Sequence, residues 1–254
     1  MSAKQERLIL VANDDGIFSK GIRALVEVAE RFGRVIVVAP DRQQSAVGHS
    51  ITISEPLRTQ KFEMKEGVTA ISVNGTPADC VKLATDQLLK EKPDLVLSGI
   101  NHGSNAGINI IYSGTVSAAT EGTILGYPSI AVSCMDFAED ADLSGAQEAA
   151  ARAVQFVFDN GLPKGITLNV NAPAGPFKRM RWARQGDSRY TDEYVARVDP
   201  VNRPYYWMFG RLEVLDEADD VDINVLKSGY ASITPIQYDL TAYKVFEAMS
   251  GMDV

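Results

Sequence analysis

The chain has 254 residues, of which 45% are hydrophobic and 23% are charged, and its formal net charge at pH 7 is −8. This composition is that of an ordinary globular protein with one sizeable core. The acidic balance argues against a nucleic-acid polymer as partner, because such binding depends on Lys and Arg neutralising phosphates. No apolar run is long enough to span a membrane or to form the core of a signal peptide, so we expect a cytosolic protein without a membrane partner.

Cysteine and histidine are scarce, with two residues of each. Cys80 and Cys134 lie far apart in apolar surroundings, which in a cytosolic protein favours buried, reduced thiols over a disulfide. A zinc site built from imidazole and thiolate groups is therefore poorly supplied. Any bound metal must be held by oxygen donors, which points to magnesium, manganese or calcium.

Continuously apolar runs alternate with helical patterns from the N-terminus onward. The helix over residues 22–29 has apolar residues at helical spacing and Gly33 in the position of a C-cap glycine. The next helix begins at the N-cap Thr76, and a later one begins with a capping-box pattern at Ser144–Gln147 and stops near Gly161. The alternation predicts an α/β fold with a Rossmann-like, doubly wound, mostly parallel sheet. The predicted buried strands are Leu8–Ala12, Val35–Ala39, Asp94–Ser98, Ser129–Ser133 and Ile166–Val170.

From residue 174 onward the pattern of residue types changes. Aromatic residues lie among charged ones with little helical periodicity before the C-terminus, which predicts β-rich arms and hairpins. Exposed aromatics on such arms usually mark a partner surface, often on a second copy of the chain. We expect a single domain with a catalytic core over 1–173 and an extension over 174–254 that packs back on the core. The aromatic residues concerned are Trp182, Tyr190, Tyr194, Tyr205, Tyr206 and Trp207.

Polar residues follow the predicted strands at their carboxyl ends, where ligands bind in open parallel sheets. The first strand runs into Asp14 and Asp15, whose charges repel unless a cation neutralises them, and then into Gly16, which makes a turn easy. The plain alternative is a solvated turn, because Asn and Asp beside Gly are common turn formers. Ser45 follows the second strand and Asn101 the third, so carboxylate, hydroxyl and amide oxygens can meet at one edge of the sheet.

The segment Gly99–Gly114 is rich in Gly, Asn and Ser and leads into a helix that begins near Thr115. Such a loop at a helix N-terminus exposes backbone N–H groups to an anion, and Ser113 and Thr115 add hydroxyl donors. The alternative is a glycine-rich crossover in which Ser113 acts only as the N-cap. A cation site at the acidic pair, next to an anion-binding loop, is typical of a metal-dependent phosphoryl-transfer site. The chain has no Walker A pattern, no GxGxxG after the first strand and no G-x-S-x-G elbow.

These residues belong to a set of motifs that is identifiable as a whole. In chain order the motifs are NDDG at 13–16, VVAP and QSA within 37–46, GTPADCV at 75–81, SGINHGSNAG at 98–107, YSGTVSAATEG at 112–122, LNVNAP at 168–173 and GYASITPIQYDLT at 229–241. The chain resembles the SurE family, the stationary-phase survival phosphatases with 5′- and 3′-nucleotidase activity. The resemblance covers nearly the whole chain, and NDDG, SGIN and YSGTV are its most specific blocks.

The resemblance implies one divalent cation per subunit, Mg²⁺ or Mn²⁺, and a nucleoside monophosphate substrate. It also implies a homodimer or tetramer, often built by exchanged C-terminal arms. The metal ligands implied for this chain are Asp14, Asp15, Ser45 and Asn101. The implied phosphate pocket consists of Asn105, Ser113, Gly114 and Thr115.

A mechanism follows as a hypothesis in which Asp14, Asp15, Asn101 and Ser113 carry catalysis. One of the two aspartates orients or deprotonates the attacking water, while Ser113 and the N-terminal amides of its helix stabilise charge on the transferring oxygens. His102 is a candidate proton donor to the leaving group. Glu121 is expected to be a structural acid, hydrogen-bonded inside the core.

Two other classes of protein fit part of the pattern. A Mg²⁺-binding phosphoacceptor or regulatory nucleotide-binding protein also uses a strand-end acidic pair, but it would need a lysine after a later strand, and none follows the third or fourth strand here. A ribosyl hydrolase would be expected to supply more acids after the first strand. The preferred nucleotide, the 5′ or 3′ position, activity on polyphosphate and the native metal all stay open at this point.

Overall fold

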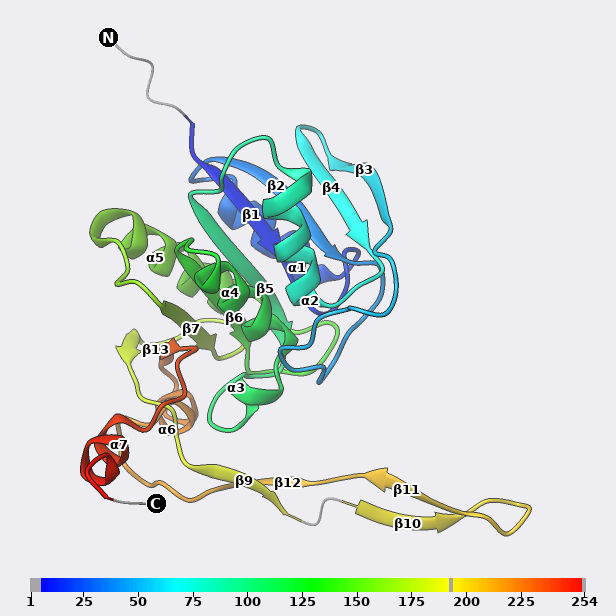
Figure 1. Ribbon diagram of the computed structural model, residues 1–254, viewed down its shortest axis with the longest axis vertical. Coiled ribbons are helices and arrows are strands. Elements are labelled where there is room, and N and C mark those ends of the chain that lie inside the picture. The colour runs from blue at the N-terminus through cyan, green and yellow to red at the C-terminus, as the bar shows by residue number, and fades with distance from the viewer. Residues whose placement is uncertain (1–5, 192–193, 253–254) are drawn as a thin grey trace.

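The computed structural model describes residues 6–191 and 194–252, and it is an α/β structure built on one large sheet (Figure 1). The prediction that the N-terminus contains no signal peptide includes residues 1–5, and these lie outside the described residues. The strand order is β3-β4-β2-β1-β5-β6-β7-β13-β8. The order reverses direction between β1 and β5, because the chain moves from β1 to β2 on one side and returns to β5 on the other. Ligands bind at such switch points in doubly wound sheets.

The predicted core strands are all present, with some ends shifted by a few residues. Every residue of β1 and β6 is buried, which explains why these runs are continuously apolar instead of alternating. The central parallel strands are β4 (Val68–Val73), β2 (Arg34–Pro40), β1 (Leu8–Ala12), β5 (Leu95–His102), β6 (Ser129–Cys134) and β7 (Ile166–Ala172).

The two ends of the sheet are formed by strands that are not among the buried strands predicted from the sequence. At one end β3 (Thr59–Lys65) pairs antiparallel with β4. At the other end β13 (Ala231–Gln237), from the C-terminal part of the chain, pairs antiparallel with β7, and β8 (Met180–Trp182) lies parallel to β13. The C-terminal part therefore contributes to the same sheet as the N-terminal part.

Helices cover both faces of the sheet. On one face α1 (Lys20–Ala29) packs against α5 (Ser144–Asn160), and on the other α2 (Pro77–Leu83) packs against α4 (Gly114–Ile124). The remaining short helices are a π-helical turn after α2 (Ala84–Leu88), α3 (Asn109–Tyr112), α6 (Asp222–Lys227) and α7 (Tyr243–Met249).

The helix ends confirm one predicted cap and correct two others. Thr76 caps α2 in a full capping box with Asp79. The capping box predicted at Ser144 is wrong: the first turn of α5 has no side-chain cap from Ser144, whose own N–H donates to Asp142 Oδ1 at 2.9 Å. Gly33 is not a C-cap, because α1 ends at Ala29 and Glu30 is its C-cap residue. A Cβ on Gly33 would lie 2.4 Å from the Arg7 carbonyl oxygen, so glycine is required there for close backbone approach.

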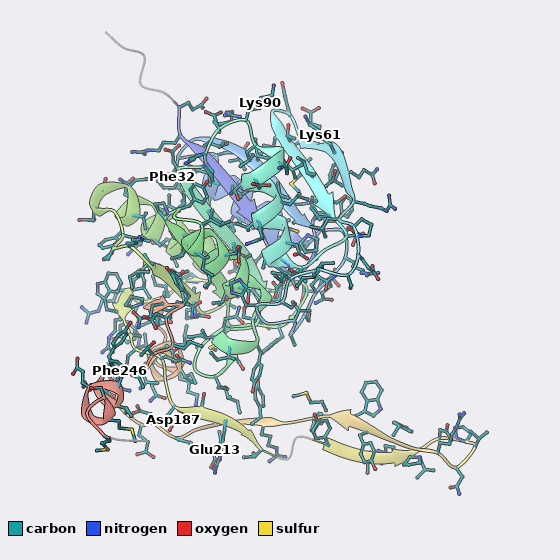
Figure 2. All side chains as sticks on the ribbon, in the orientation of Figure 1. Phe32, Lys61, Lys90, Asp187, Glu213 and Phe246 are labelled. Carbon is teal, nitrogen blue, oxygen red and sulfur yellow. The ribbon has the colours of Figure 1, made fainter. Side chains whose placement is uncertain are left out.

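The C-terminal part extends from the body of the molecule as a long β-ribbon, called the arm from here on (Figure 1). It consists of β9 (Ser188–Thr191) paired with β12 (Arg211–Val214), followed by β10 (Tyr194–Val198) paired with β11 (Pro204–Met208). Side chains stand off both sides of its outer half (Figure 2). The predicted β-rich arm is thus confirmed, and Tyr194, Tyr205, Tyr206 and Trp207 are exposed.

The remaining predictions about the body of the fold concern thiols and membranes. Cys80 and Cys134 are free and buried, as expected. Within the ranges that the structure describes, no helix combines the length and hydropathy needed to cross a membrane.

Candidate active site

The acidic pair lies where β1 ends, and the chain turns there as the sequence predicts. Gly16 has φ +93°, in the region that favours glycine. Asn13 fixes the turn by donating from Nδ2 to the Gly16 carbonyl oxygen at 3.0 Å and to Ser19 Oγ at 2.9 Å. Asp14 is only 6% exposed, so the alternative of a simple solvated turn is wrong for this residue.

Asp14 is a buried carboxylate held against the start of α4. The Thr115 hydroxyl donates a hydrogen bond to Asp14 Oδ1. Burial raises the pKa of Asp14 to about 6 from the usual 3.8; the Thr115 hydrogen bond lowers it and the neighbouring Asp15 charge raises it. A Cβ on Gly114 would lie 2.7 Å from Asp14 Cβ, so only glycine lets the helix approach this closely.

Asp15 has an unsatisfied oxygen. Burial raises its pKa, partly offset by the backbone and charge of His102 and by Gln43. Gln43 Nε2 donates to Asp15 Oδ1 at 3.3 Å, but the buried Oδ2 atom has no hydrogen-bond partner among the described residues. Buried polar atoms are nearly always paired, so an orphaned carboxylate oxygen beside a second carboxylate is suited to a cation.

The other two predicted ligands complete an oxygen-donor set. Asn101 Nδ2 donates to the carbonyl oxygens of Gly103 at 2.7 Å and His102 at 3.2 Å, so its amide nitrogen is engaged within its own loop. Ser45 lies on an exposed loop that reaches Asp14. One hollow of about 540 Å³ is lined by all four residues, Asp14, Asp15, Ser45 and Asn101.

This donor set fits a hard divalent cation. Two carboxylates, a hydroxyl and an amide oxygen are the ligand types that Mg²⁺ and Mn²⁺ prefer. In the described residues no group of three or more His, Cys, Asp or Glu side chains is placed to hold a metal. The neutral oxygens of Ser45 and Asn101 line the same hollow as the acidic pair and are available as further donors. The orphaned Asp15 Oδ2 is the structural feature that fits best with a bound ion.

The predicted phosphate residues lie in two different positions. Asn105 and Ser113 line the hollow. Ser113 is the N-cap of α4, with its Oγ accepting from the Val116 N–H at 3.0 Å, so the capping role weighed from the sequence is confirmed. Gly114 and Thr115 are buried behind the hollow, where Thr115 bonds to Asp14. Contact of Thr115 with phosphate stays a prediction.

Asn105 is fixed by two buried asparagines that sequence reasoning passed over. Its N–H donates to Asn171 Oδ1 at 2.7 Å, its carbonyl oxygen accepts from Asn169 Nδ2 at 2.7 Å, and its own Nδ2 donates to Ser133 Oγ at 2.8 Å. Asn169 and Asn171 are fully buried in β7. The available signal was their spacing, since two amides at alternate positions in an apolar strand share one face.

The glycine-rich loop is also held from the C-terminal part of the chain. The fully buried Asp222 accepts hydrogen bonds from the Gly107 N–H at 2.9 Å and the Gly186 N–H at 3.0 Å. Burial raises the pKa of Asp222, while these backbone N–H groups lower it. Nothing in the local sequence links residues so far apart.

The histidines and Glu121 have separate environments. His102 lines the hollow, with Nδ1 2.8 Å from the Ala138 carbonyl oxygen, so its role as a proton donor stays a prediction. Glu121 is the buried, hydrogen-bonded structural acid that was expected. His49 reaches Glu121 rather than the hollow.

Aromatic and apolar side chains form the outer wall of the hollow, which the sequence analysis did not assign. Tyr112, Phe137, Tyr190 and Met208 line it, the last two from the arm. The Tyr190 hydroxyl donates to Asn109 Oδ1 at 2.8 Å, which fixes the ring. The base of the arm is therefore part of the wall of the site.

Comparison with known proteins identifies the family of the chain. A family model described as "Survival protein SurE" matches residues 9–192. The chain belongs to the SurE family. A SurE relative from Cytophaga hutchinsonii, named 5′-nucleotidase SurE, is 48% identical over 242 residues, which cover 94% of this chain and 93% of the relative.

Two further SurE proteins extend the comparison. The relative from Moorella thermoacetica, also named 5′-nucleotidase SurE, is 48% identical over 248 residues, covering 96% of this chain and 95% of the relative. The crystal structure of the SurE protein from Aquifex aeolicus matches with a TM-score of 0.83 at 41% identity, covering 96% of this chain and 98% of that one. The Rossmann-like α/β fold expected from the sequence is confirmed.

Proposed function

We propose that this SurE protein is a divalent-metal-dependent 5′-nucleotidase that hydrolyses nucleoside monophosphates to nucleoside and phosphate. The observation that carries the proposal is the buried, unpaired Asp15 Oδ2 beside Asp14, in a hollow that Ser45 and Asn101 also line. Relatives that match nearly the full chain bear the name 5′-nucleotidase.

The metal-binding role falls to Asp14, Asp15, Ser45 and Asn101. A divalent cation bound there would make a coordinated water more acidic and withdraw charge from the phosphoryl group. Asp14 and Asp15 would hold the cation with their carboxylates, and one of them would accept a proton from the attacking water. Asn101 presents its amide oxygen, since its Nδ2 is bonded to the carbonyl oxygens of Gly103 and His102.

Stabilisation of the phosphoryl oxygens falls to the start of α4 and to Asn105. Ser113 Oγ accepts a hydrogen bond from the Val116 N–H, which leaves its hydroxyl proton free to donate to a phosphoryl oxygen. The first N–H groups of α4 carry the positive end of the helix dipole. Thr115 acts through Asp14, to which it donates its hydrogen bond.

The outer wall supports a nucleoside as the leaving group. Aromatic rings bind nucleobases by stacking, and Tyr112, Phe137 and Tyr190 stand around the mouth of the hollow. A volume of about 540 Å³ is in the range of small-molecule sites. The proposal extends to 3′-nucleotides and short polyphosphates, because Ser113 and a cation held by Asp14 and Asp15 would act only on the phosphoryl group that all of these share.

The exposed aromatics of the arm support a homo-oligomer. Trp207 is 66% exposed and Tyr206 65% exposed, which is a large apolar area to leave in water. We propose that a second copy of the chain covers these residues in a dimer or tetramer.

The deciding experiment measures phosphate release from 5′- and 3′-nucleoside monophosphates and short polyphosphate. Protein stripped with EDTA is assayed with Mg²⁺ or Mn²⁺ added back. Asp14→Asn and Asp15→Asn should each lower release at least about a hundredfold, because a lost metal ligand removes several kcal/mol of transition-state stabilisation. The matched control is Asp159→Asn, an exposed carboxylate on α5.

Each alternative has its own outcome. Folded protein that binds the cation but releases no phosphate from any substrate would contradict the nucleotidase proposal and favour a phosphoacceptor or regulatory protein. Full activity after EDTA treatment, or in the two site variants, would contradict the metal-dependent mechanism.

A further inference from the structure

The loop that carries Ser45 is long and has no helix or strand of its own. It connects β2 to β3 over residues 41–58 and is called the ligand loop from here on. Loops of this length without secondary structure are uncommon in compact domains, and loops are more mobile than the elements that they connect. Ser45 can act as a metal ligand only if something holds the loop at a fixed distance from Asp14 and Asp15.

Backbone hydrogen bonds hold the first half of the ligand loop. The Gln44 N–H donates to the Asp14 carbonyl oxygen at 2.7 Å, and the Gly48 N–H donates to the Tyr112 carbonyl oxygen at 3.0 Å. These bonds frame Ser45 on both sides. They do not explain what fixes the loop beyond Gly48, where the chain leaves the site.

A buried carboxylate meets the ligand loop at His49. Glu121 lies on α4, and its side chain is 4% exposed. His49 Nε2 lies 2.8 Å from Glu121 Oε2, and Lys82 Nζ donates to Glu121 Oε1 at 2.7 Å. Burial alone would raise the pKa of Glu121, but the hydrogen bonds from His49 and Lys82 lower it, so the group is a carboxylate with a partner on each oxygen.

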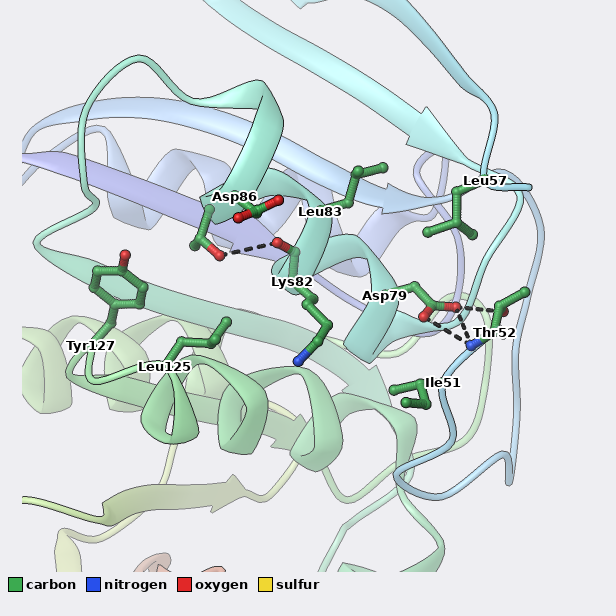
Figure 3. A pocket seen from close by; sticks show the side chains of 10 residues that line it. Ile51, Thr52, Leu57, Asp79, Lys82, Leu83, Asp86, Leu125 and Tyr127 are labelled. Atoms are coloured by element: carbon green, nitrogen blue, oxygen red, sulfur yellow. Dashed lines mark hydrogen bonds between the residues drawn. The ribbon is translucent and has the colours of Figure 1, made fainter. Parts of the chain in front are cut away.

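A second buried carboxylate meets the loop at Thr52. Asp79 of α2 is 3% exposed and accepts the Thr52 N–H at 3.0 Å on Oδ1 and the Thr52 hydroxyl at 2.5 Å on Oδ2 (Figure 3). Asp79 also accepts the Thr76 N–H at 2.8 Å in its capping box. Thr76 Oγ1 in turn donates to the Ser50 carbonyl oxygen at 2.8 Å. The N-terminus of α2 is thus an anchor for the loop.

The two anchors tie the loop to α4, whose start forms part of the site, and to α2, which packs against α4. Glu121 lies on α4, whose first residues pack on Asp14, and Lys82 links α4 to α2. His49 stands four positions after Ser45, so a displacement of His49 is transmitted over a short length of chain. Lys82 bonds to the same carboxylate from α2 and makes no hydrogen bond to the loop among the described residues, which makes it a matched control.

We propose that His49 and Thr52 are positioning residues, whose bonds to Glu121 and Asp79 fix the ligand loop so that Ser45 and Gln43 face the acidic pair. This inference rests on the proposed role of Ser45 as a metal ligand. It assigns no contact with substrate to His49.

The first test measures amide hydrogen exchange in the metal-free protein. His49→Ala should speed exchange at residues 43–48 about tenfold, because the loop opens more often when one anchor is lost. His49→Gln keeps a donor for Glu121 and should restore most of the protection. Thr52→Val removes only the hydroxyl bond to Asp79 and should give a smaller increase in the same amides.

The second test measures Mn²⁺ affinity by titration and then kcat and KM for a phosphomonoester at saturating Mn²⁺. His49→Ala should weaken Mn²⁺ binding about tenfold, the scale seen when a residue that orients a ligand is removed, with His49→Gln near wild type. Saturating metal should restore most of kcat. Lys82→Met should stay within about twofold of wild type in both affinity and loop exchange.

The outcomes separate this inference from the proposed function. Unchanged exchange and Mn²⁺ affinity in both His49→Ala and Thr52→Val overturn the inference, even if the wild type is an active nucleotidase. Equal losses in Lys82→Met and His49→Ala also overturn it, because they would reflect general destabilisation around Glu121. A wild type that neither binds Mn²⁺ nor releases phosphate overturns the proposed function, and the exchange result then shows by itself whether the anchors hold the loop.

Discussion

The carboxyl edge of the central sheet and the outer half of the arm are opposite kinds of structure in one chain. At the sheet edge, Asp14 and Asn105 are buried, and hydrogen bonds from neighbouring strands and helices fix their positions. On the arm, every residue of β11 is exposed, and its pairing with β10 is the main support of either strand. The sheet edge is fixed by contacts with the chain's own core, whereas the main contacts of the outer arm are those between its own two strands.

The largest change in the free energy of unfolding should come from a substitution in the core beneath the site. Leu97 lies in β5 with no exposed surface, next to β1. We expect Leu97→Ala to lower the free energy of unfolding by about 2–5 kcal/mol, through lost burial and the cavity that remains. Urea unfolding followed by circular dichroism checks this value. A loss below about 1 kcal/mol would mean that the sheet beneath the site is less tightly packed than its burial indicates.

A smaller change in the free energy of unfolding, and one that stabilises the fold, should come from replacing Asp14 in metal-free protein. Its pKa is about 6 in the folded state and about 3.8 unfolded. The folded state therefore binds more protons between these values, and stability falls as the pH rises from about 4 to 6. We expect Asp14→Asn to stabilise the metal-free protein at pH 8 by at most about 3 kcal/mol, and to change nothing at pH 3.5.

Thermal unfolding at the two pH values, with EDTA present, measures this effect. Asp159→Asn on the surface of α5 is the control and should be neutral at both. Addition of Mg²⁺ at pH 8 should stabilise the wild type and leave Asp14→Asn unchanged. A variant less stable than the wild type at pH 8 without metal would contradict the view that Asp14 is ionised at the expense of stability.

The smallest effect on the isolated chain should come from the arm. Trp207 is 66% exposed, so Trp207→Ala should change the unfolding free energy of dilute protein by less than about 0.5 kcal/mol. If a second copy covers the arm, the same variant should weaken self-association, as measured by sedimentation velocity over a range of concentrations. Unchanged association would show that the arm's aromatics do not form the interface.

The same contrast explains which parts of the fold the sequence predicts. Strand Leu8–Ala12 and the Thr76 cap are matched without correction, because each depends on local pattern alone. The C-cap expected at Gly33 is wrong because a tertiary contact, the close approach of the Arg7 carbonyl oxygen, decides that position. The cap expected at Ser144 is wrong for a local reason, because Asp142, two residues earlier, accepts a hydrogen bond from the Ser144 N–H. Strand β13 was not expected in the sheet, since pairing between distant segments leaves no local pattern.

The site residues also divide into those that local sequence predicts and those that depend on contacts between distant segments. Residues that directly follow strands, such as Asp14 and Asn101, can be found because the topology of a parallel sheet brings strand ends together. Residues that fix the glycine-rich loop at Asn105 and Gly107, such as Asn169 and Asp222, act across long separations and look like ordinary buried or loop residues in the sequence. The motif alone also could not show that the Thr115 hydroxyl points to Asp14.

The late arrival of β13 has a consequence for synthesis of the chain. Among the strands that the structure describes, β13 alone pairs with the outer edge of β7, and it is made after the whole arm has been translated. Until then a nascent chain that has already assembled β1 to β7 presents an open, apolar strand edge, the kind of surface that pairs wrongly with other chains. The predicted core over 1–173 would carry this open edge permanently. The solubility of the full-length chain during translation should therefore depend on how quickly the ribosome releases residues 231–237. A pause within the arm should favour aggregation.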